Sequence, residues 1–252
     1  MLTALVTGGS RGIGEAIVRA LHASGANVFA TYLSASERAA VIERELDERV
    51  AFARCDLADS AALPGLVDAC RARFGRLDVL VNNAAIFAEN PFDGEDYARW
   101  REGWQRTFAV NVFGAADLTW LALRVMRAQA PQGLAGTRGR IVNVASRAAH
   151  RGELTFADYG ASKAALVNLT KSLARACARD GVAAFAVAPG FIETEMAASE
   201  LSARRAEIEA EIPGGRVATP AEVASIVVFL ACGGADYATG TTLDVNGASY
   251  VR

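Results

Sequence analysis

A tyrosine and a lysine stand one helical turn apart in residues 157–180, a stretch with helical periodicity. Tyr159 and Lys163 occupy positions i and i+4, so a helix places both on one face. A free phenol has a pKa of about 10, and a nearby ammonium group favours its ionised form. Such a phenol can exchange a proton with an alcohol or a carbonyl near neutral pH. A helix-surface pair without chemistry has the same spacing, so the pair alone leaves both interpretations open.

Ser146 and Asn111 add two polar groups that could serve the same chemistry. Ser146 ends the apolar run 140–146, a predicted strand, and its hydroxyl can orient a substrate oxygen or simply form a turn. Asn111 lies inside the predicted helix 97–128, where asparagine competes for backbone hydrogen bonds. It indicates either a functional distortion or water ligand, or a buried amide whose hydrogen bonds are satisfied.

The stretch after the first predicted strand is rich in glycine. Residues 7–14 are T-G-G-S-R-G-I-G, and they lie between the apolar run 2–7 and a helical pattern over 13–23. Glycines allow close backbone approach, and a helix start offers N–H groups to a phosphate. The spacing differs from the commoner G-x-G-x-x-G fingerprint. We interpret the stretch as a cradle for a dinucleotide pyrophosphate, formed by Thr7, Gly8, Ser10, Arg11, Gly12, Ile13 and Gly14.

Strand-like and helix-like runs alternate along the chain. The alternation predicts right-handed crossovers and a single α/β domain over residues 1–252, with a Rossmann-like, doubly wound, seven-stranded parallel sheet and helices on both faces. Strands are predicted over residues 2–7, 27–32, 50–54, 77–82, 140–146, 182–188 and 241–245. Helices are predicted over residues 13–23, 36–47, 60–74, 97–128, 157–180 and 220–232.

Ligands of such sheets bind at the carboxyl ends of the strands. Beyond the glycine stretch, the candidate binding residues there are Tyr32, Ser34, Asp56, Leu57, Asn83, Ala84, Ala85, Pro189 and Gly190. The end of the second strand carries no acidic residue, which would bind the ribose hydroxyls and repel a 2′-phosphate. Arg11 can donate to that phosphate, or it is a solvated loop charge. Both features favour NADP(H), with NAD(H) as the alternative cofactor.

The composition excludes several classes of function. A formal net charge of −2 argues against a nucleic-acid partner and gives no sign of membrane-surface binding. No uninterrupted apolar segment approaches the ~20 residues that span a bilayer. The cysteines form no C-x-x-C pair, so we predict no metal site and expect buried thiols in a cytoplasmic protein. They are Cys55, Cys70, Cys177 and Cys232.

Together these motifs resemble the short-chain dehydrogenase/reductase family, over essentially the whole chain. Residues 7–14 match its T-G-x-x-x-G-x-G motif, and residues 82–85 resemble its N-N-A-G segment. Ala85 stands where the family usually has glycine, which leaves the geometry of that turn open. The family's catalytic tetrad is matched in order and approximate spacing by Asn111, Ser146, Tyr159 and Lys163.

The resemblance implies an oxidoreductase that interconverts a ketone and a secondary alcohol, with the hydride supplied by the cofactor. It makes Tyr159 the acid/base and lets Lys163 lower the pKa of that phenol and bind the nicotinamide ribose. Ser146 would orient the substrate oxygen. Asn111 would hold a water in a proton relay from the lysine.

Further contacts with the cofactor are implied in the same way. Asp56 matches the position that meets the adenine amino group, and Ile192 and Thr194 follow the turn where the family contacts the cofactor. The family usually forms dimers or tetramers. We expect a homotetramer through residues 97–128 and 157–180 and through the C-terminal strand region.

The substrate is less defined than the cofactor. The segments 188–194 and 239–247 resemble those of 3-oxoacyl-[acyl-carrier-protein] reductases, so an acyl carrier protein thioester is one candidate, although relatives with other substrates share them. The loop 131–140 is longer than in those reductases, which keeps an alcohol or sugar dehydrogenase open. A dinucleotide-binding subunit without chemistry is a third interpretation.

Two variable segments should bound the substrate: residues 147–156 and a lid over residues 191–215. Arg147, His150 and Arg151 make the first segment basic, either to meet an acidic substrate or as solvated charges. We do not expect His150 to be the catalytic base, because Tyr159 fills that role.

Overall fold

The computed structural model of the protein describes residues 1–131 and 136–252, so residues 132–135 of the predicted loop lie outside the described residues. Seven strands form one parallel sheet in the order β3-β2-β1-β4-β5-β6-β7, as predicted. The strand order reverses at β1, which has β2 on one side and β4 on the other, and such sheets bind ligands at this switch point. The strands are β1 Thr3–Val6, β2 Asn27–Tyr32, β3 Val50–Arg54, β4 Val79–Asn82, β5 Gly139–Val144, β6 Val182–Pro189 and β7 Thr242–Val245.

Helices cover both faces of the sheet, because the strands are apolar on both sides. On β1, Ala4 and Val6 join the core that α1 and α9 complete, whereas Leu5 joins the core against α3, α5 and α7. The helices are α1 Gly12–Ala23, α2 Ser36–Leu46, α3 Leu63–Phe74, α4 Tyr97–Phe108, α5 Ala115–Ala128, α6 Ala148–Arg151, α7 Ala157–Cys177, α8 Ala198–Ala210 and α9 Pro220–Ala231.

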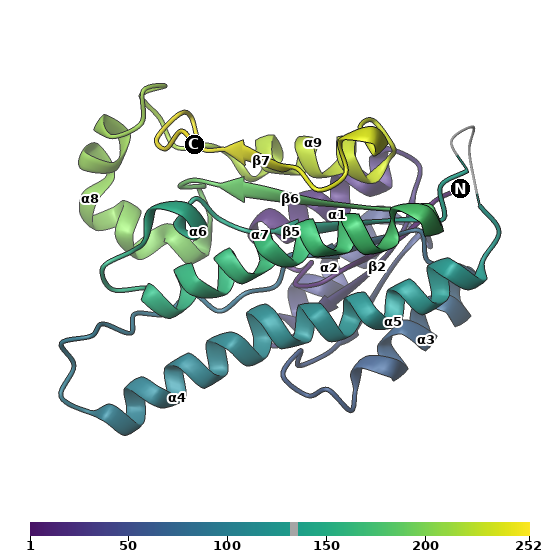
Figure 1. Cartoon of the computed structure of the whole chain (residues 1–252), viewed down its shortest axis with the longest axis horizontal. Helices are drawn as coiled ribbons and strands as arrows, with labels where there is room; N and C mark the ends of the chain where they lie inside the picture. Colours follow the sequence, from purple (N-terminus) through teal and green to yellow (C-terminus); the bar gives the residue numbers. More distant parts are fainter. Residues whose placement is uncertain (132–135) are drawn as a thin grey trace.

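The predicted helix 97–128 is not continuous. A π-helix, Ala109–Gly114, separates α4 from α5 and contains Asn111. The run Tyr97–Ala128 is long and apolar enough to cross a membrane by length and composition, a property that the sequence analysis did not anticipate. In the fold this run lies beside α7 and α3, so its apolar residues serve packing (Figure 1).

The carboxyl ends of the strands carry most of the irregular structure. The segment 191–215, predicted as a lid, holds a short 3-10 turn, Glu195–Ala197, followed by α8. Figure 1 shows α6 and α8 together beyond the ends of β6 and β7. Cys55, Cys70 and Cys177 are buried as expected, whereas Cys232 is exposed at the end of α9.

Candidate active site

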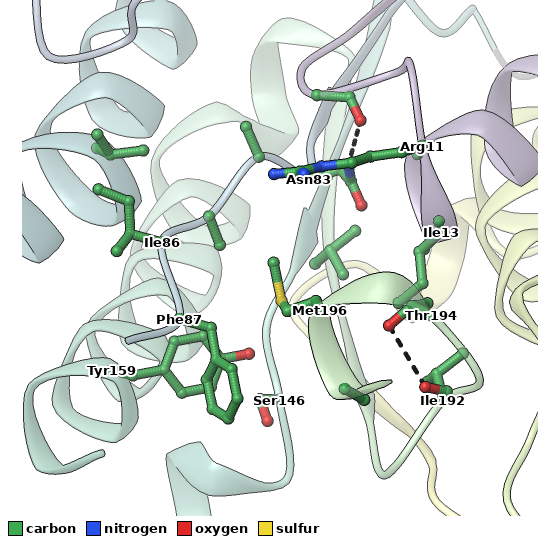
Figure 2. A pocket seen from close by; sticks show the side chains of 18 of the residues that line it. Arg11, Ile13, Asn83, Ile86, Phe87, Ser146, Tyr159, Ile192, Thr194 and Met196 are labelled. Atoms are coloured by element: carbon green, nitrogen blue, oxygen red, sulfur yellow. Dashed lines mark hydrogen bonds between the residues drawn. The ribbon is translucent and has the colours of Figure 1, made fainter. Parts of the chain in front are cut away.

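One pocket lies along the carboxyl ends of the strands, and almost every candidate site residue lines it. Its wall includes the glycine turn after β1, the ends of β2 to β6 and the first residues of the lid. In Figure 2, Tyr159, Ser146 and Phe87 lie at one end of the pocket and Arg11 and Asn83 lie at the other. The predicted residues on the wall are Gly8, Ser10, Arg11, Gly12, Ile13, Gly14, Tyr32, Ser34, Asp56, Leu57, Asn83, Ala84, Ala85, Ser146, Tyr159, Lys163, Pro189, Gly190, Ile192 and Thr194. Thr7 and Asn111 do not line the pocket, but they form hydrogen bonds with residues that do.

The glycine turn needs its glycines for close packing. A Cβ on Gly14 would lie 1.9 Å from the carbonyl oxygen of Gly8, closer than any real contact. Gly8 and Gly12 have φ of 67° and 54°, in the left-handed region that favours glycine. Because α1 begins at Gly12, its free N–H groups and positive dipole end lie at the pocket wall. This cradle fits a pyrophosphate, which supports the dinucleotide interpretation.

Thr7 joins the glycine turn to the loop after β4. Its Oγ1 accepts hydrogen bonds from the backbone N–H groups of Asn83 and Ala84, both at 3.0 Å. The side chain of Asn83 donates in return to the carbonyl oxygens of Thr7 and Gly8, at 2.9 and 3.1 Å. Thr7 therefore positions residues that line the pocket and does not line it itself.

Ala85 raises no conflict with its place in that loop. Among the described residues, only Asp47 and Ala248 combine a side chain beyond hydrogen with a positive φ. Ala85 has an ordinary backbone conformation, so this turn does not require glycine. The loop after β4 therefore tolerates alanine at position 85.

Lys163 is deeply buried at the catalytic end. It is 2% exposed, and its Nζ donates a hydrogen bond to the carbonyl oxygen of Val144 at 2.7 Å. Burial lowers the pKa of this ammonium to about 7. The lysine is therefore held against the end of β5, with Nζ 5.6 Å from the centre of the Tyr159 ring.

The pKa of Tyr159 differs from the sequence-based expectation. Burial raises it to about 12, an interaction with the Ser146 hydroxyl opposes the rise, and the charge of Glu153 adds to it. The expected lowering by the ammonium of Lys163 does not appear, because desolvation disfavours the charged form of each group. The phenol is therefore a protonated donor here.

Ser146 sits two residues beyond β5, where the predicted strand end placed it approximately. Its Oγ accepts a hydrogen bond from the backbone N–H of Ala148 at 3.1 Å, which orients the hydroxyl at the start of α6. In Figure 2 the hydroxyl groups of Ser146 and Tyr159 lie on the same side of the pocket. One carbonyl oxygen could receive hydrogen bonds from both.

Asn111 combines the two interpretations that its sequence position left open. It lies in the π-helix and is 1% exposed. Its Oδ1 accepts from the N–H of Ile86 at 2.7 Å, and its Nδ2 donates to the oxygen of Ile86 at 3.0 Å and to Ser162 Oγ at 3.0 Å. The side chain is thus a satisfied amide that ties the loop after β4 to α7, inside a distorted helix.

Charged pairs mark the far end of the pocket. Both carboxylate oxygens of Asp56 accept hydrogen bonds from Arg106 Nη2, at 3.2 and 2.9 Å. A backbone hydrogen bond from Ala58 and this arginine lower the pKa of Asp56. Arg11 is largely exposed, with its Nη1 4.0 Å from Glu195 of the lid. Arg106 also lines the pocket, but it belongs to no sequence motif that could have predicted this position.

The substrate end contains side chains that the motif analysis missed. Phe87 and Phe156 stack with ring centres 4.0 Å apart, and Phe87 meets the edge of Tyr159. Glu153 and Glu200 line the same wall. Only their positions in the two segments predicted to bound the substrate could have indicated them.

The basic segment behaves differently from either expectation. Arg147 is 4% exposed, donates to Ser249 Oγ at 2.7 Å, and places its guanidinium over the ring of Phe191. Arg151 pairs with Glu153 at 3.7 Å. His150 stacks on Tyr250 and is not among the residues that line the pocket.

Comparison with known proteins agrees with this geometry. The family model described as enoyl-(acyl carrier protein) reductase matches residues 8–248. The chain is 37% identical over 249 residues to the 3-oxoacyl-[acyl-carrier-protein] reductase FabG of Escherichia coli, covering 98% of this chain and 97% of that protein. It is also 32% identical over 259 residues to a galactitol 2-dehydrogenase of Agrobacterium fabrum, with 98% and 97% covered.

A solved structure resembles the whole fold. The crystal structure of a glucose/ribitol dehydrogenase of the SDR type from Brucella melitensis has a TM-score of 0.90 and 34% identity. The alignment covers 100% of this chain and 97% of that one. The whole chain thus shares its fold with that structure.

Proposed function

Because the chain belongs to the short-chain dehydrogenase/reductase family, we propose that it is an NADP(H)-dependent oxidoreductase that interconverts a ketone and a secondary alcohol. One observation carries the proposal: Ser146, Tyr159 and the buried Lys163 line the same pocket as the glycine turn. A nucleotide cradle and a proton donor at opposite ends of one pocket are the parts that hydride transfer needs.

Each catalytic side chain has a distinct task in this proposal. The bound cofactor supplies the hydride. Ser146 donates a hydrogen bond to the substrate oxygen, and Tyr159 gives that oxygen a proton as the alcohol forms. Lys163, with its pKa near 7, becomes charged where a bound ribose and phosphates surround it, and then favours return of the phenol to the ionised state. Asn111 holds the loop and helix that frame these groups.

The cofactor preference rests on the end of β2. The residues from Thr31 to Ala35 line the pocket there without a carboxylate, and Arg11 lines the same pocket. We expect NADPH to bind at least about ten-fold more tightly than NADH, since one charge-assisted hydrogen bond contributes roughly 1.5–3 kcal/mol. Arg11→Gln should remove most of the difference. Equal affinity of the wild type for both cofactors, measured by nicotinamide fluorescence, would transfer the assignment to NAD(H).

Two substrate classes follow from the relatives. The 3-oxoacyl thioester of an acyl carrier protein is supported by the similarity to the FabG reductases. A sugar or sugar alcohol is supported by the similarity to galactitol 2-dehydrogenase. A panel of acyl thioesters, simple ketones and ketoses, followed by loss of NADPH absorbance, separates the two. A chain that binds NADPH and reduces none of them is the non-catalytic subunit instead.

We also propose a cytoplasmic homotetramer. Phe113 and Trp120 are 61% and 58% exposed on the π-helix and α5, within the run that we expect to form an interface. Burial of such side chains between subunits removes apolar area from water. A single monomeric species in sedimentation velocity at micromolar concentration would exclude the assembly.

A further inference from the structure

We infer that the substrate carries a hydrogen-bond donor, a hydroxyl or an ammonium group, beside its reacting carbonyl, and that Glu153 and Glu200 receive it. This inference rests on the proposed function and specifies the substrate class of the same pocket. It separates polar ketones from fatty acyl thioesters and from oxo acids. The argument depends on the wall that surrounds Tyr159.

An aromatic surface forms one side of that wall. Phe87 and Phe156 stack in nearly parallel planes at 9°, with centres 4.0 Å apart. The rings of Phe87 and Tyr159 pack in a T-shaped arrangement, with their centres 4.9 Å apart and their planes at 75°. These rings exclude water from the reacting oxygen and strengthen every polar contact nearby. A negative ring face also attracts a cation and tolerates the C–H face of a hydroxylated chain.

Two carboxylates form the other side. Glu153 comes from the segment after α6, and Glu200 comes from α8 of the lid; both line the pocket that Ser146 and Tyr159 share. Glu153 has only a long contact with Arg151, at 3.7 Å. In the described parts of the chain, Glu200 has no ion pair. Ionised carboxylates only accept hydrogen bonds, so a partner must supply donors.

The electrostatics of the wall agree with this placement. Desolvation, followed by the charge of Glu153, raises the pKa of Glu200. The same Glu153 contributes to the raised pKa of Tyr159. The charge of Glu153 therefore acts on both the phenol and Glu200, so the two carboxylates lie within electrostatic reach of one another. A substrate anion there would meet two like charges, whereas an alkyl chain would desolvate them without supplying a partner.

The positive charge of Arg147 does not cancel the negative charge of Glu153 and Glu200. Its guanidinium is buried against Phe191 and donates to Ser249, so it belongs to the wall. Desolvation and the nearby charge of Arg151 lower the pKa of Arg147, and the charges of Glu153, Glu211 and Glu200 oppose that lowering. Arg147 lines the pocket as well, but it is only 4% exposed and its guanidinium is already held by Ser249 and Phe191, so it offsets only part of the acidic potential. The more exposed charged groups beside it are the two carboxylates.

A matched series of ketones tests the inference on the full-length protein with NADPH. The four substrates are ethyl ketones that differ in one substituent: hydroxymethyl, aminomethyl, ethyl and carboxymethyl. We expect kcat/KM for the hydroxymethyl or the aminomethyl ketone to exceed that for diethyl ketone at least about ten-fold. The carboxymethyl ketone should be the poorest. A higher value for the hydroxymethyl ketone identifies a hydroxyl donor, and the reverse identifies an ammonium donor.

Three variants tie the preference to the carboxylates. In Glu153→Gln and Glu200→Gln the preference over diethyl ketone should fall at least about three-fold, because the charge is removed at constant shape. Glu207→Gln is the control, since Glu207 lies on the same helix α8 but does not line the pocket. It should keep the wild-type preference.

The outcomes distinguish this inference from the proposed function. Best turnover of diethyl ketone or of the carboxymethyl ketone overturns the inference and leaves the oxidoreductase in place. An unchanged preference in both pocket variants also overturns it. Reduction of none of the four ketones, with turnover of an acyl thioester retained, overturns the inference alone. Turnover of neither these ketones nor any acyl thioester or ketose, with NADPH bound, overturns the proposed function as well.

Discussion

The two ends of the pocket differ in the groups that form their walls. At the proposed nucleotide end the wall is shaped by three backbone features, with charged pairs beside them: the glycine turn, the start of α1 and the loop that Thr7 holds by two hydrogen bonds. At the catalytic end the wall is made of side chains whose charge depends on burial, above all Tyr159 and Lys163. Backbone geometry tolerates little change of volume, whereas buried titratable groups respond to pH and to what is bound.

Tyr159→Phe should show the largest effect at the catalytic end. The variant keeps the ring against Phe87 and removes only the proton donor, so turnover should fall by about 10³-fold or more. NADPH binding, followed by fluorescence, should stay within a few-fold of the wild type. Activity near the wild-type level in this variant would assign the acid/base to another group.

Gly14→Ala should show the largest effect at the nucleotide end. The new Cβ meets the oxygen of Gly8 at 1.9 Å, so the turn must shift, with a loss of about 1–3 kcal/mol in unfolding free energy and no measurable NADPH binding. Gly65→Ala is the control, because nothing lies within 4 Å of its Cβ position. In α3 that control should be neutral or stabilising by up to about 1 kcal/mol. Normal cofactor affinity in Gly14→Ala would show that backbone does not limit this end.

The pH dependence of stability should report the burial of Lys163. Its folded-state pKa of about 7 lies below its ordinary value of 10.5. Between these pH values the unfolded chain binds a proton that the folded chain does not, so the unfolding free energy rises with pH across that window. Below that window both states hold the proton, and the full cost of burying the charged lysine is present. The ligand-free wild type should therefore gain stability as the pH rises above 7.

Denaturant unfolding of two variants checks this slope. Lys163→Met removes the titrating group and should flatten the gain, whereas the exposed Lys171→Met should keep it. The comparison stays below the ordinary pKa of tyrosine, at about 10. If all three proteins show the same slope, Lys163 is charged when folded, and the contrast between the two ends of the pocket weakens.

Arg106→Gln should show the smallest effect. Arg106 pairs with Asp56 at the nucleotide end, but both side chains are partly exposed, at 43% and 35%. Solvent-exposed ion pairs contribute about 1 kcal/mol or less, so the Kd of NADPH should change less than about five-fold, with kcat unaltered. A larger loss of affinity would mean that the arginine itself contacts the nucleotide.

Motifs predicted which residues gather at the proposed nucleotide end of the pocket. Every predicted cofactor residue except Thr7 lines the pocket, because a glycine turn at a strand end imposes the same local geometry wherever it occurs. The strand pattern likewise predicted the seven-stranded sheet, since runs that are apolar on both faces must be covered on both.

Other features required long-range contacts. The periodicity of residues 97–128 predicted one helix, but the amide of Asn111 bonds to Ile86 within a π-helix. The spacing of Tyr159 and Lys163 predicted a lowered phenol pKa. Burial instead raises the pKa of the Tyr159 phenol and lowers the pKa of the Lys163 ammonium. Local sequence carries no information on how deeply a side chain is desolvated.

The sequence by itself determined the sheet, the glycine cradle and the order of the catalytic groups, because these depend on local periodicity and on residue type at strand ends. Only the tertiary structure decided which side chains face Tyr159. Glu153 and Glu200 come from separate segments and line one pocket. The desolvation of Glu200 and the effect of the charge of Glu153 on it depend on that arrangement, which no spacing along the chain encodes.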